Sequence, residues 1–476
     1  MTALLTLATI SLYIALLFVV ARISRRRGES RFTGGHNQRW WVVALAMVGA
    51  PMTGITFISV PGEVGVSGFS YLQMVLGFVV GSVIIAYWLI PLYYRHNVTS
   101  LYEYLDNRFG VCSHTTGAGF FLLSKMVSAS LRVFVVCLVI QQLLCNALGV
   151  PFGVTVPLFV LLAWLYTYRG GVAAVVWTDV LKTLCMVLCV VLCGIFLLCE
   201  LDLSASEAVA QASEMGLTNT LFFDDIDSSL HFVKMFFAGI FMIVAMTGLD
   251  QDMMQRALSS RSVRSAQRNM VVASLLQMVV IVMLLGLGAL LYLYLAARGE
   301  SVAISDNAFA FVATRGGMPA IVSILLVLGV VSASFSSTGG ALTSLTTSFM
   351  VDILRKKELP TSKRKWIHAA MAVVLVVLVW GFDAWSNESS IRLFYRLASY
   401  TYGPLLGMFA FGLLSKRAVC DKLVPVVAVV SPAICGVLDY LSPTLFGGYE
   451  FGFEILLLNA TATIVGLLLI RHKPTK

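Results

Sequence analysis

Long runs of apolar residues repeat along this chain and leave it few ways to fold. Residues 269–297, for example, contain no charged side chain. A helix of about 20 apolar residues crosses the hydrocarbon core of a bilayer. Only 12% of the residues are charged, against about 25% in an average soluble domain. The alternating ten-residue pattern of an outer-membrane barrel is absent from the sequence. We therefore expect an all-α integral membrane protein.

The hydropathy pattern predicts thirteen transmembrane helices in a single domain over residues 1–476. The first has neither a basic leading region nor a small-residue cleavage site, so we expect it to be retained and not removed as a signal peptide. No segment between spans is long enough to build a core of its own. The expected spans cover residues 2–21, 40–60, 71–94, 117–147, 152–168, 172–199, 231–249, 269–297, 317–352, 367–384, 394–414, 423–441 and 453–470.

Basic residues mark one side of the membrane. Six arginines lie between residues 22 and 39, four between 256 and 268, and six lysines or arginines between 355 and 365. The segment 200–233 carries seven acidic residues and no basic one. Because basic loops stay cytoplasmic, we expect the N-terminus outside and the C-terminus in the cytoplasm, in a plasma (inner) membrane. The net charge of +9 then reflects topology and not a nucleic-acid partner.

The second span contains residues that interrupt a helix. Its middle reads Met47-Val48-Gly49-Ala50-Pro51-Met52-Thr53-Gly54. Pro51 has no N–H to donate, and glycines weaken a helix. Carbonyls released near the middle of a membrane must face protein, water or a cation. A simple proline kink is the alternative, although an interrupted span followed by a polar one is the layout of secondary transporters with inverted repeats.

A dense polar run lies inside the span expected at 317–352. It reads Val331-Ser332-Ala333-Ser334-Phe335-Ser336-Ser337-Thr338. Hydroxyls at bilayer depth beside small residues can line a dehydrated cation site, because a hard cation takes oxygen ligands. Alternatively, the serines bond back to carbonyls one turn earlier, or let a neighbouring helix approach closely.

Charged residues within spans indicate ion pairs or a transport path. Asp179 lies about two turns into the sixth span, where an interfacial position is open, and Lys182 could be a purely structural partner. Arg132 lies in mid-span with no acidic residue in the same span. It either pairs with another helix or binds an anionic group of a solute. Thr56 and Gln73 are polar candidates, with helix packing as the alternative.

Four motifs, in order, resemble those of the sodium:solute symporter family, whose members transport sugars, proline, pantothenate and sialic acid. They are Leu101-Tyr102-Glu103-Tyr104-Leu105 with Arg108-Phe109, Arg169-Gly170-Gly171 through Thr178-Asp179, Gly248-Leu249-Asp250-Gln251 with Gln255-Arg256, and Tyr402-Gly403-Pro404-Leu405-Leu406-Gly407. The resemblance covers nearly the whole chain and implies a leucine-transporter-type core. In that core, five helices (residues 40–199) are inverted against the next five (231–415). Residues 2–21 supply one extra helix before the core and 423–470 two after it.

The resemblance also implies Na+ as the coupling ion. The family's shared sodium site uses three backbone carbonyls and two hydroxyls from two separate helices. In this chain those positions fall on Gly49, Met52, Ala333, Ser336 and Ser337. On a helix Ala333 lies three and four residues before the two serines, so the carbonyl and both hydroxyls share one face.

A second ion site is less well supported by this sequence. Some relatives bind a second sodium at the position of Asp179, with extra hydroxyls one turn beyond the paired serines. Here Gly339 and Gly340 stand at those later positions and offer no side-chain oxygen, so we expect one sodium per cycle. Lys182 replaces a residue that is often glutamine in relatives. Asp179 stays open as a second ion or coupling residue, including one that titrates in a proton-coupled version.

Sialic-acid members of the family bind the solute carboxylate with an arginine of the third core helix, helped by hydroxyls of the first and a glutamine of the second. The matching positions are Thr53, Thr56, Gln73 and Arg132, while Pro51 stands where such relatives carry another hydroxyl. We therefore expect a sodium-coupled importer of a small carboxylated solute such as sialic acid, working by alternating access. A sugar, proline or another metabolite is the alternative solute.

Two other classes of function stay open. A transporter-like membrane sensor would need an output domain, such as the kinase of some relatives, which these 476 residues do not contain. An ion-independent facilitator would transport without sodium. No enzyme is expected, because the loops contain neither a catalytic constellation nor a nucleotide-binding loop. The expected partners are the solute, sodium and the lipid bilayer, and a monomer would suffice.

Overall fold

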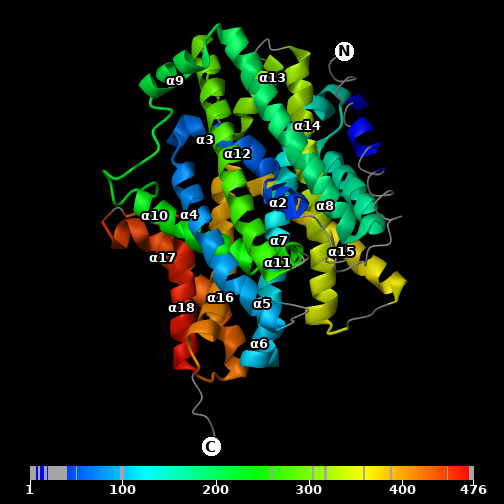
Figure 1. Ribbon diagram of the computed structural model, residues 1–476, viewed down its shortest axis with the longest axis vertical. Coiled ribbons are helices and arrows are strands. Elements are labelled where there is room, and N and C mark those ends of the chain that lie inside the picture. The colour runs from blue at the N-terminus through cyan, green and yellow to red at the C-terminus, as the bar shows by residue number, and fades with distance from the viewer. Residues whose placement is uncertain are drawn as a thin grey trace, which may run out of the picture.

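The computed structural model describes residues 7–8, 11–15, 19, 40–49, 51–96, 101–258, 260, 262–302, 305–315, 319–356, 360–385, 389–447 and 449–470, which form a bundle of helices (Figure 1). The helices are α2 (Trp40–Gly49), α3 (Gly54–Ser67), α4 (Tyr71–Ile84), α5 (Ile90–His96), α6 (Glu103–Arg108), α7 (Val111–Ile140), α8 (Phe152–Leu201), α9 (Ala205–Glu214), α10 (Phe232–Ile243), α11 (Gln251–Leu258), α12 (Val263–Ala297), α13 (Ala308–Arg315), α14 (Ala320–Ser348), α15 (Thr361–Trp385), α16 (Ser390–Leu414), α17 (Val424–Leu445) and α18 (Ile455–Leu469). Short π-helical segments extend several of them: η2 (Ile85–Leu89), η3 (Gln141–Cys145), η5 (Val244–Gly248) and η7 (Phe349–Ile353).

The all-helical membrane fold expected from the sequence is confirmed. Within the described part of the chain, 8 helical segments are long and apolar enough to cross a membrane. They include α4 with η2 and α5, α7 with η3, α12, α14 with η7, α15, α16 and α17. α10 with η5 and α18 are shorter apolar helices. Of the expected first span, 2–21, the structure describes residues 7–8, 11–15 and 19, and the count of thirteen stays a prediction.

The prediction that the chain leaves its helix between the fifth and sixth spans is wrong. Residues 152–168 and 172–199 both lie within α8, whose helical hydrogen bonding continues through residues 169–171. Two adjacent glycines weaken a helix by about 1 kcal/mol each, which does not have to end it. α8 therefore contains both expected spans.

The predicted interruption of the second span is confirmed. α2 ends at Gly49 and α3 begins at Gly54, with Thr53 extended between them. The N–H of Thr53 donates to the hydroxyl of Thr56 at 3.4 Å and closes the first turn of α3. Among the described residues, no hydrogen bond ends on the carbonyl oxygen of Gly49 or Met52. These two carbonyls therefore need another partner.

A second interruption, between η5 and α11, was not predicted. Leu249 and Asp250 leave the helical path there. The carbonyl of Gly248 accepts a 2.9 Å hydrogen bond from the buried hydroxyl of Tyr93, and that of Leu249 accepts one of 3.1 Å from Tyr102. Side chains of the protein thus satisfy these carbonyls, whereas the described residues supply no donor to those of Gly49 and Met52 at the first interruption.

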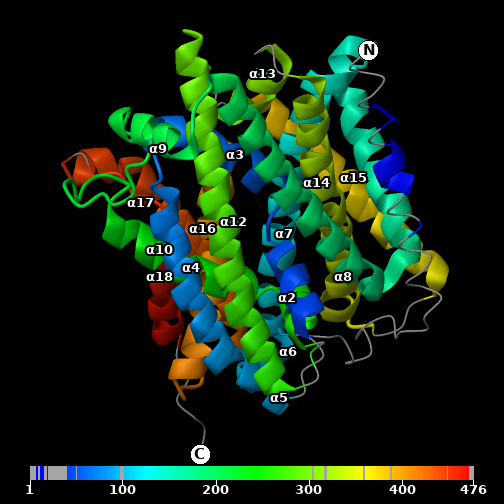
Figure 2. The same ribbon diagram turned by 45° about the horizontal axis from the view of Figure 1, so that its top comes forward.

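Glycines allow helices in the bundle to pack backbone against backbone. A Cβ on Gly77 of α4 would lie 2.2 Å from the carbonyl oxygen of Phe236 in α10, and a Cβ on Gly239 would lie 2.2 Å from that of Met74. Small residues at such contacts are a main source of helix association in membranes. α12 packs against α3 and α4 and crosses the bundle beside them (Figure 2).

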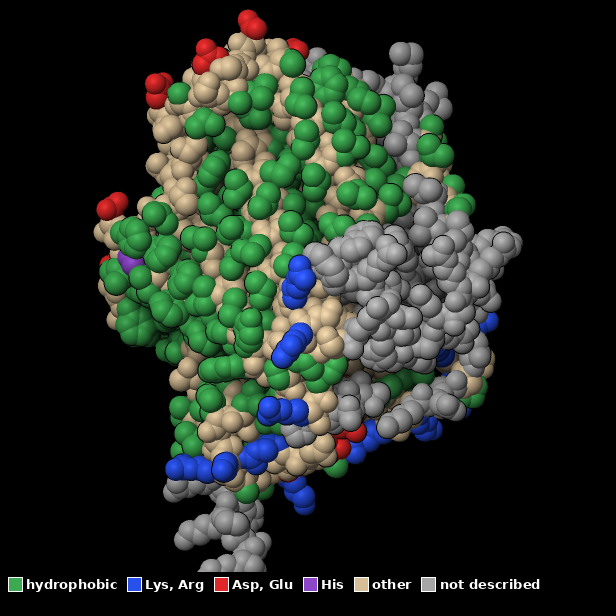
Figure 3. Space-filling model, in the orientation of Figure 1, with side chains coloured by type: hydrophobic (Ala, Val, Ile, Leu, Met, Phe, Trp, Pro, Cys, Tyr) green, Lys and Arg blue, Asp and Glu red, His purple; other side chains and the backbone are tan. Residues whose placement is uncertain are grey.

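The surface of the bundle is divided into three zones (Figure 3). On the face in view, most lysines and arginines lie toward the lower end, most acidic side chains lie at the upper end, and apolar side chains cover most of the region between. Val373, Val377 and Trp380 of α15 are examples of large apolar residues left exposed. Such a wide apolar zone is what a lipid-facing surface requires.

Candidate functional site

The helix interruption lies against α14. A Cβ on Gly54 would lie 2.6 Å from the hydroxyl oxygen of Ser334 and 3.8 Å from Val330, so α3 begins directly on the polar run. In that run the hydroxyl of Ser337 donates to the carbonyls of Ala333 and Ser334, each at 3.1 Å. Two of the expected sodium ligands, Ala333 and Ser337, are therefore adjacent and buried.

Ser337 shows the back-bonded geometry that was the alternative interpretation of these serines. Only its proton is used in those bonds, so lone pairs of its oxygen remain available to a cation. Ser336 lies in α14, but its side chain is outside the described part of the structure.

The other side of the interruption packs on α8. A Cβ on Gly49 would lie 2.4 Å from Oγ1 of Thr183 and 2.8 Å from the carbonyl oxygen of Asp179, so only glycine fits there. Gly49 thus packs on α8 and Gly54 on α14, and the carbonyls of Gly49 and Met52 between these two contacts receive no hydrogen bond from the described residues. Unwound carbonyls beside hydroxyls are the groups with which transporters bind sodium, so the residues present fit that ion.

Asp179 is buried in the bundle. Its exposed fraction is 0%. Lys182 is confirmed as a partner, with Nζ 3.6 Å from Oδ1, and Arg256 of α11 pairs with Oδ2. The sequence did not predict Arg256, because the second interruption that aims α11 at α8 was not predicted either.

A cavity of about 50 Å³ lies beside the first interruption. Three of the four residues expected to bind solute line it, namely Thr53, Thr56 and Arg132. The guanidinium of Arg132 lies over the ring of Phe394, 5.3 Å from its centroid, which favours a cation there. The wall also contains Pro51 and the polar or aromatic residues Tyr71, Phe78, Ser128, Gln277, Tyr395 and Tyr402.

Gln73, the fourth expected residue, lies outside this lining and is 0% exposed. Its Nε2 donates to the carbonyls of Leu230 at 3.0 Å and Ser70 at 3.3 Å, and its Oε1 accepts from the N–H of Phe222 at 3.1 Å. Gln73 thus ties the segment between α9 and α10 to α4. This is the packing role that the sequence left open.

An ion pair in the cavity wall was missed from the sequence. Nζ of Lys125 lies 2.8 and 3.1 Å from the two carboxylate oxygens of Asp250, and both residues are buried. Asp250 also accepts from the N–H of Met253 at 3.2 Å, which caps α11. Lys125 could have been found by the rule that singled out Arg132, since it is a basic residue inside a span.

A larger space of about 620 Å³, which we call the vestibule, adjoins the cavity. Tyr71, Ile391 and Tyr395 line both spaces. The hydroxyls of Tyr71 and Tyr395 form a 2.7 Å hydrogen bond, so the two rings stand between the spaces. In the vestibule Nε of Arg392 donates to Glu63 at 2.6 Å and joins α16 to α3.

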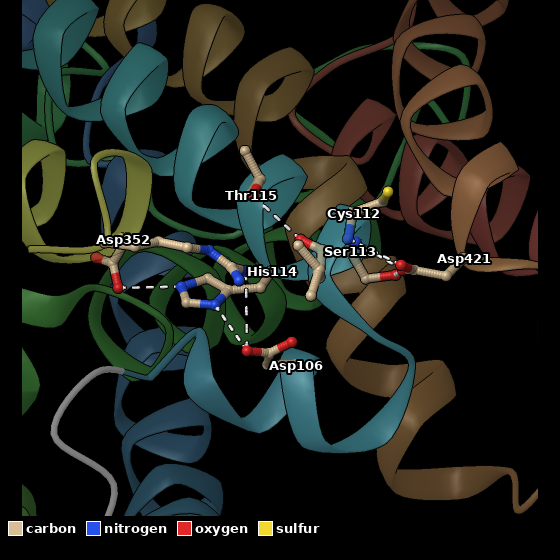
Figure 4. Close-up of polar contacts among 9 residues, drawn as sticks. Asp106, Cys112, Ser113, His114, Thr115, Asp352 and Asp421 are labelled. Carbon is tan, nitrogen blue, oxygen red and sulfur yellow. Dashed lines mark hydrogen bonds and ion pairs between the residues drawn. The ribbon is translucent and has the colours of Figure 1, made fainter.

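A separate polar cluster lies at the lower end of the bundle (Figure 4). Nε2 of His114 in α7 lies 3.2 Å from Asp352 of η7, and Nδ1 lies 3.5 Å from Asp106 of α6. The carboxylate of Asp421, which precedes α17, accepts from two backbone N–H groups of α7 at 2.8 Å and from the hydroxyl of Ser113 at 2.6 Å. The contacts cap α7 and hold the ends of four elements together.

Comparisons with known proteins agree with this architecture. The profile of the Sodium:solute symporter family matches residues 31–421. The sodium/sialic acid symporter SiaT of Proteus mirabilis is 24% identical over 438 residues, which cover 88% of this chain and 87% of that protein. The sodium/sialic acid symporter NanT of Aliivibrio fischeri is 26% identical over 443 residues, with 89% and 85% covered.

Solved structures share the fold. A Na+-coupled sialic acid symporter in a substrate-bound, outward-open state superposes with a TM-score of 0.80 at 20% identity, over 98% of this chain and 97% of that one. The nucleobase-cation-symport-1 family transporter Mhp1, in a closed conformation, gives a TM-score of 0.60 at 15% identity, over 92% and 93%. The family profile matches well over half of this chain, residues 31–421, so the chain belongs to the sodium:solute symporter family.

Proposed function

We propose that this protein is a sodium-coupled symporter that imports a small carboxylated solute by alternating access. The observation that carries this proposal is the helix interruption: the carbonyls of Gly49 and Met52 accept no hydrogen bond from the described residues, Gly54 packs on α14, and a cavity lined by Arg132 lies beside them. Two of its relatives are sodium/sialic acid symporters. Sialic acid is a carboxylated sugar and is the solute we favour.

The proposed sodium ligands come from two separate helical segments. They are the carbonyls of Gly49, Met52 and Ala333 and the hydroxyls of Ser336 and Ser337. The contact of Gly54 with Ser334 supports this assignment, because it brings the interruption onto the same turn of α14. A site shared between two elements is complete only in the conformations that bring them together, so the ion stabilises those conformations.

The charges of the cavity wall support an anionic solute. Its charged residues are Lys125, Arg132 and Asp250, two cations and one anion, and Lys125 is paired with Asp250. Arg132 can bind a carboxylate with two parallel hydrogen bonds. Thr53 and Thr56 add hydroxyls from α3, whereas Gln73 contributes only by anchoring the segment next to the cavity.

The two spaces and the ion pair suggest the order of opening. Tyr71 and Tyr395 separate the cavity from the vestibule, so their parting admits solute from that side. Lys125 and Asp250 line the cavity and not the vestibule, and they join α7 to the second interruption. In the proposed cycle they part when the cavity opens on the opposite side.

The proposed architecture is two inverted repeats, residues 40–199 and 231–415, with one helix before them and two after. The two interruptions support it, since one breaks the first membrane helix of the first repeat and the other lies at the end of the first membrane helix of the second. The basic zone of Figure 3 lies at the end of the bundle toward which α18 runs. By the positive-inside rule this end is cytoplasmic, with the N-terminus outside, in the plasma (inner) membrane.

Uptake by the purified protein in proteoliposomes tests the proposal. Sialic acid uptake driven by an inward sodium gradient should stop when choline replaces sodium, and a facilitator would be unaffected by this exchange. A thermal-shift screen of sugars, amino acids and carboxylates, with and without sodium, identifies the solute if it is not sialic acid, because a ligand stabilises the state that binds it.

Substitution of the two serines tests the ion site. Ser336→Ala with Ser337→Ala should abolish both sodium-dependent uptake and sodium-dependent stabilisation. Ser332→Ala is the matched control, because this buried serine of the same helix bonds back to the carbonyl of Gly329 at 2.9 Å. Sodium-dependent uptake that survives the double substitution would overturn the assignment.

A further inference from the structure

Lys182 carries a charge that the proposed transport cycle does not use. It lies in α8, is 0% exposed, and its Nζ has no hydrogen-bond partner in the described part of the structure. The carboxylate oxygen with which it pairs, Oδ1 of Asp179, is 3.6 Å away, beyond hydrogen-bond distance. An ammonium group has three N–H donors, and burying them unsatisfied is unfavourable.

The carboxylate of Asp179 is shared with a second cation. Arg256 of α11 pairs with its other oxygen, Oδ2, and is only 4% exposed. These three side chains contain two positive charges and one negative charge. Removal of the Lys182 charge would leave Asp179 paired with Arg256, so the lysine is not required to neutralise the aspartate.

The ammonium group of Lys182 lies beside the first helix interruption. A Cβ on Gly49 would be 3.4 Å from Cε of Lys182, the carbon that bears the ammonium group. The carbonyl of Gly49 is one of the proposed sodium ligands. Since charges interact strongly in a buried, low-dielectric region, an ammonium group this close opposes the binding of any cation at the interruption.

We propose that Lys182 is a resident cation of the coupling region. Its ammonium group takes the space beside Asp179 that another metal cation would need, and its charge lowers the affinity of the single sodium at the interruption. The inference rests on the proposed sodium site. Gly339 and Gly340, on the polar run of α14, offer no side-chain oxygen that would help to hold another ion.

A weakened sodium site suits a symporter that releases its ion into the cytoplasm. There the sodium concentration is low, and an ion held too tightly would keep the carrier from returning. The lysine would act throughout the cycle as a fixed charge, without transferring a proton. It is thus a positioning and affinity-setting residue and not a ligand of sodium.

Sodium binding to the full-length protein in detergent tests this inference without any transport assay. The probe is sodium chloride, exchanged against choline chloride at constant ionic strength, and the readouts are the unfolding temperature and the binding of radioactive sodium. Lys182→Gln and Lys182→Met should lower the dissociation constant for sodium by about tenfold or more, whereas Lys182→Arg, which keeps the charge, should stay within about threefold of the wild type.

Lys234→Gln is the matched control. This lysine also belongs to a membrane helix, but its Nζ lies 3.6 Å from the centroid of the Tyr449 ring and donates to the carbonyl of Asp227 at 3.1 Å. Its removal should leave sodium binding unchanged. Equal sodium affinity in the wild type and in either folded neutral variant of Lys182 would overturn the inference.

The number of bound ions provides a second test that needs no variant. At saturation the wild type should bind one radioactive sodium ion per chain. Two bound ions would contradict the proposal that Lys182 excludes a second sodium beside Asp179. A wild type that binds no sodium in either measurement refutes the proposed function itself. A wild type that binds one sodium, with neutral variants that bind it no more tightly, refutes only the role of Lys182.

Discussion

The hydroxyls of Tyr71 and Tyr395 lie 2.7 Å apart where the vestibule meets the cavity. The two ring centroids are 6.2 Å apart, and the ring of Phe78 lies 6.4 and 6.3 Å from them. The hydrogen bond joins α4 to α16, which come from opposite halves of the chain. Its loss is the smallest change that would favour a connection between the two spaces.

Tyr71→Phe and Tyr395→Phe should therefore make the cavity more accessible from the vestibule. Each removes one hydroxyl and keeps the ring. A net contribution of about 0.5–1.5 kcal/mol for the hydrogen bond corresponds to about a twofold to tenfold larger open fraction. The measurement is the rate at which a membrane-impermeant maleimide labels Ser128→Cys in the cavity wall, corrected for labelling of the native cysteines. Tyr440→Phe, at an 85% exposed site, is the control, and equal rates in all variants would contradict this prediction.

Arg132→Gln should weaken solute binding and spare sodium binding. The substitution removes the charged fork but keeps a polar side chain beside Phe394. Hydrogen bonds to charged groups contribute about 1.5–3 kcal/mol, so the solute dissociation constant should rise by about 10- to 150-fold. Calorimetric titration with the solute identified by the screen measures this, and sodium-dependent stabilisation should persist. Solute binding at wild-type strength would exclude Arg132 as the carboxylate partner.

Asp250→Asn and Lys125→Met should each destabilise the protein, and the two losses of stability should not add. Breaking one partner of a buried ion pair leaves the other charge unpaired and costs about 3–5 kcal/mol. Asparagine can keep the cap on the N–H of Met253, which isolates the effect of charge. The loss of stability in the double variant should be clearly smaller than the sum of the single losses, as measured by unfolding in detergent. Additive losses would show that the pair is not coupled.

Gly77→Ala should destabilise the contact between α4 and α10. Its Cβ would lie 2.2 Å from a backbone oxygen, which cannot move aside as a side chain can. Overpacking of this kind costs about 1–3 kcal/mol. Gly286→Ala in α12 is the control: no atom lies within 4 Å of its added Cβ, and loss of a helical glycine should gain about 0.5–1 kcal/mol. The unfolding temperature should thus fall in Gly77→Ala and rise in Gly286→Ala.

The sequence predicted best those features that follow from local chemistry. Pro51 between two glycines predicted the interruption of the second span, and the structure places it between Gly49 and Gly54. Apolar length predicted most of the helices. The arginine in a span predicted a polar cavity residue, and Arg132 lines the cavity.

Features that depend on pairing between distant segments were not predictable in the same way. Tyr71 and Tyr395 are 324 positions apart, and nothing near either residue indicates the other. The second interruption contains no proline, so its local sequence is compatible with a continuous helix. The hydroxyls that satisfy its carbonyls belong to Tyr93 and Tyr102, which lie in other segments. The role of Gln73 could not be assigned from the sequence, because a buried amide can serve helix packing or solute binding and the sequence does not show its hydrogen-bond partners.

The capping of α7 by Asp421 constrains the order in which this protein is built. The N–H of Cys112 and the carboxylate that accepts from it are 309 positions apart. At a synthesis rate of about 5–20 residues per second, the ribosome needs about 15 to 60 s to travel between them. The first turn of α7 therefore lacks its capping carboxylate until the segment just before α17 has been made. Nascent chains arrested before residue 421 should show the start of α7 as a protease-sensitive site that disappears in longer chains.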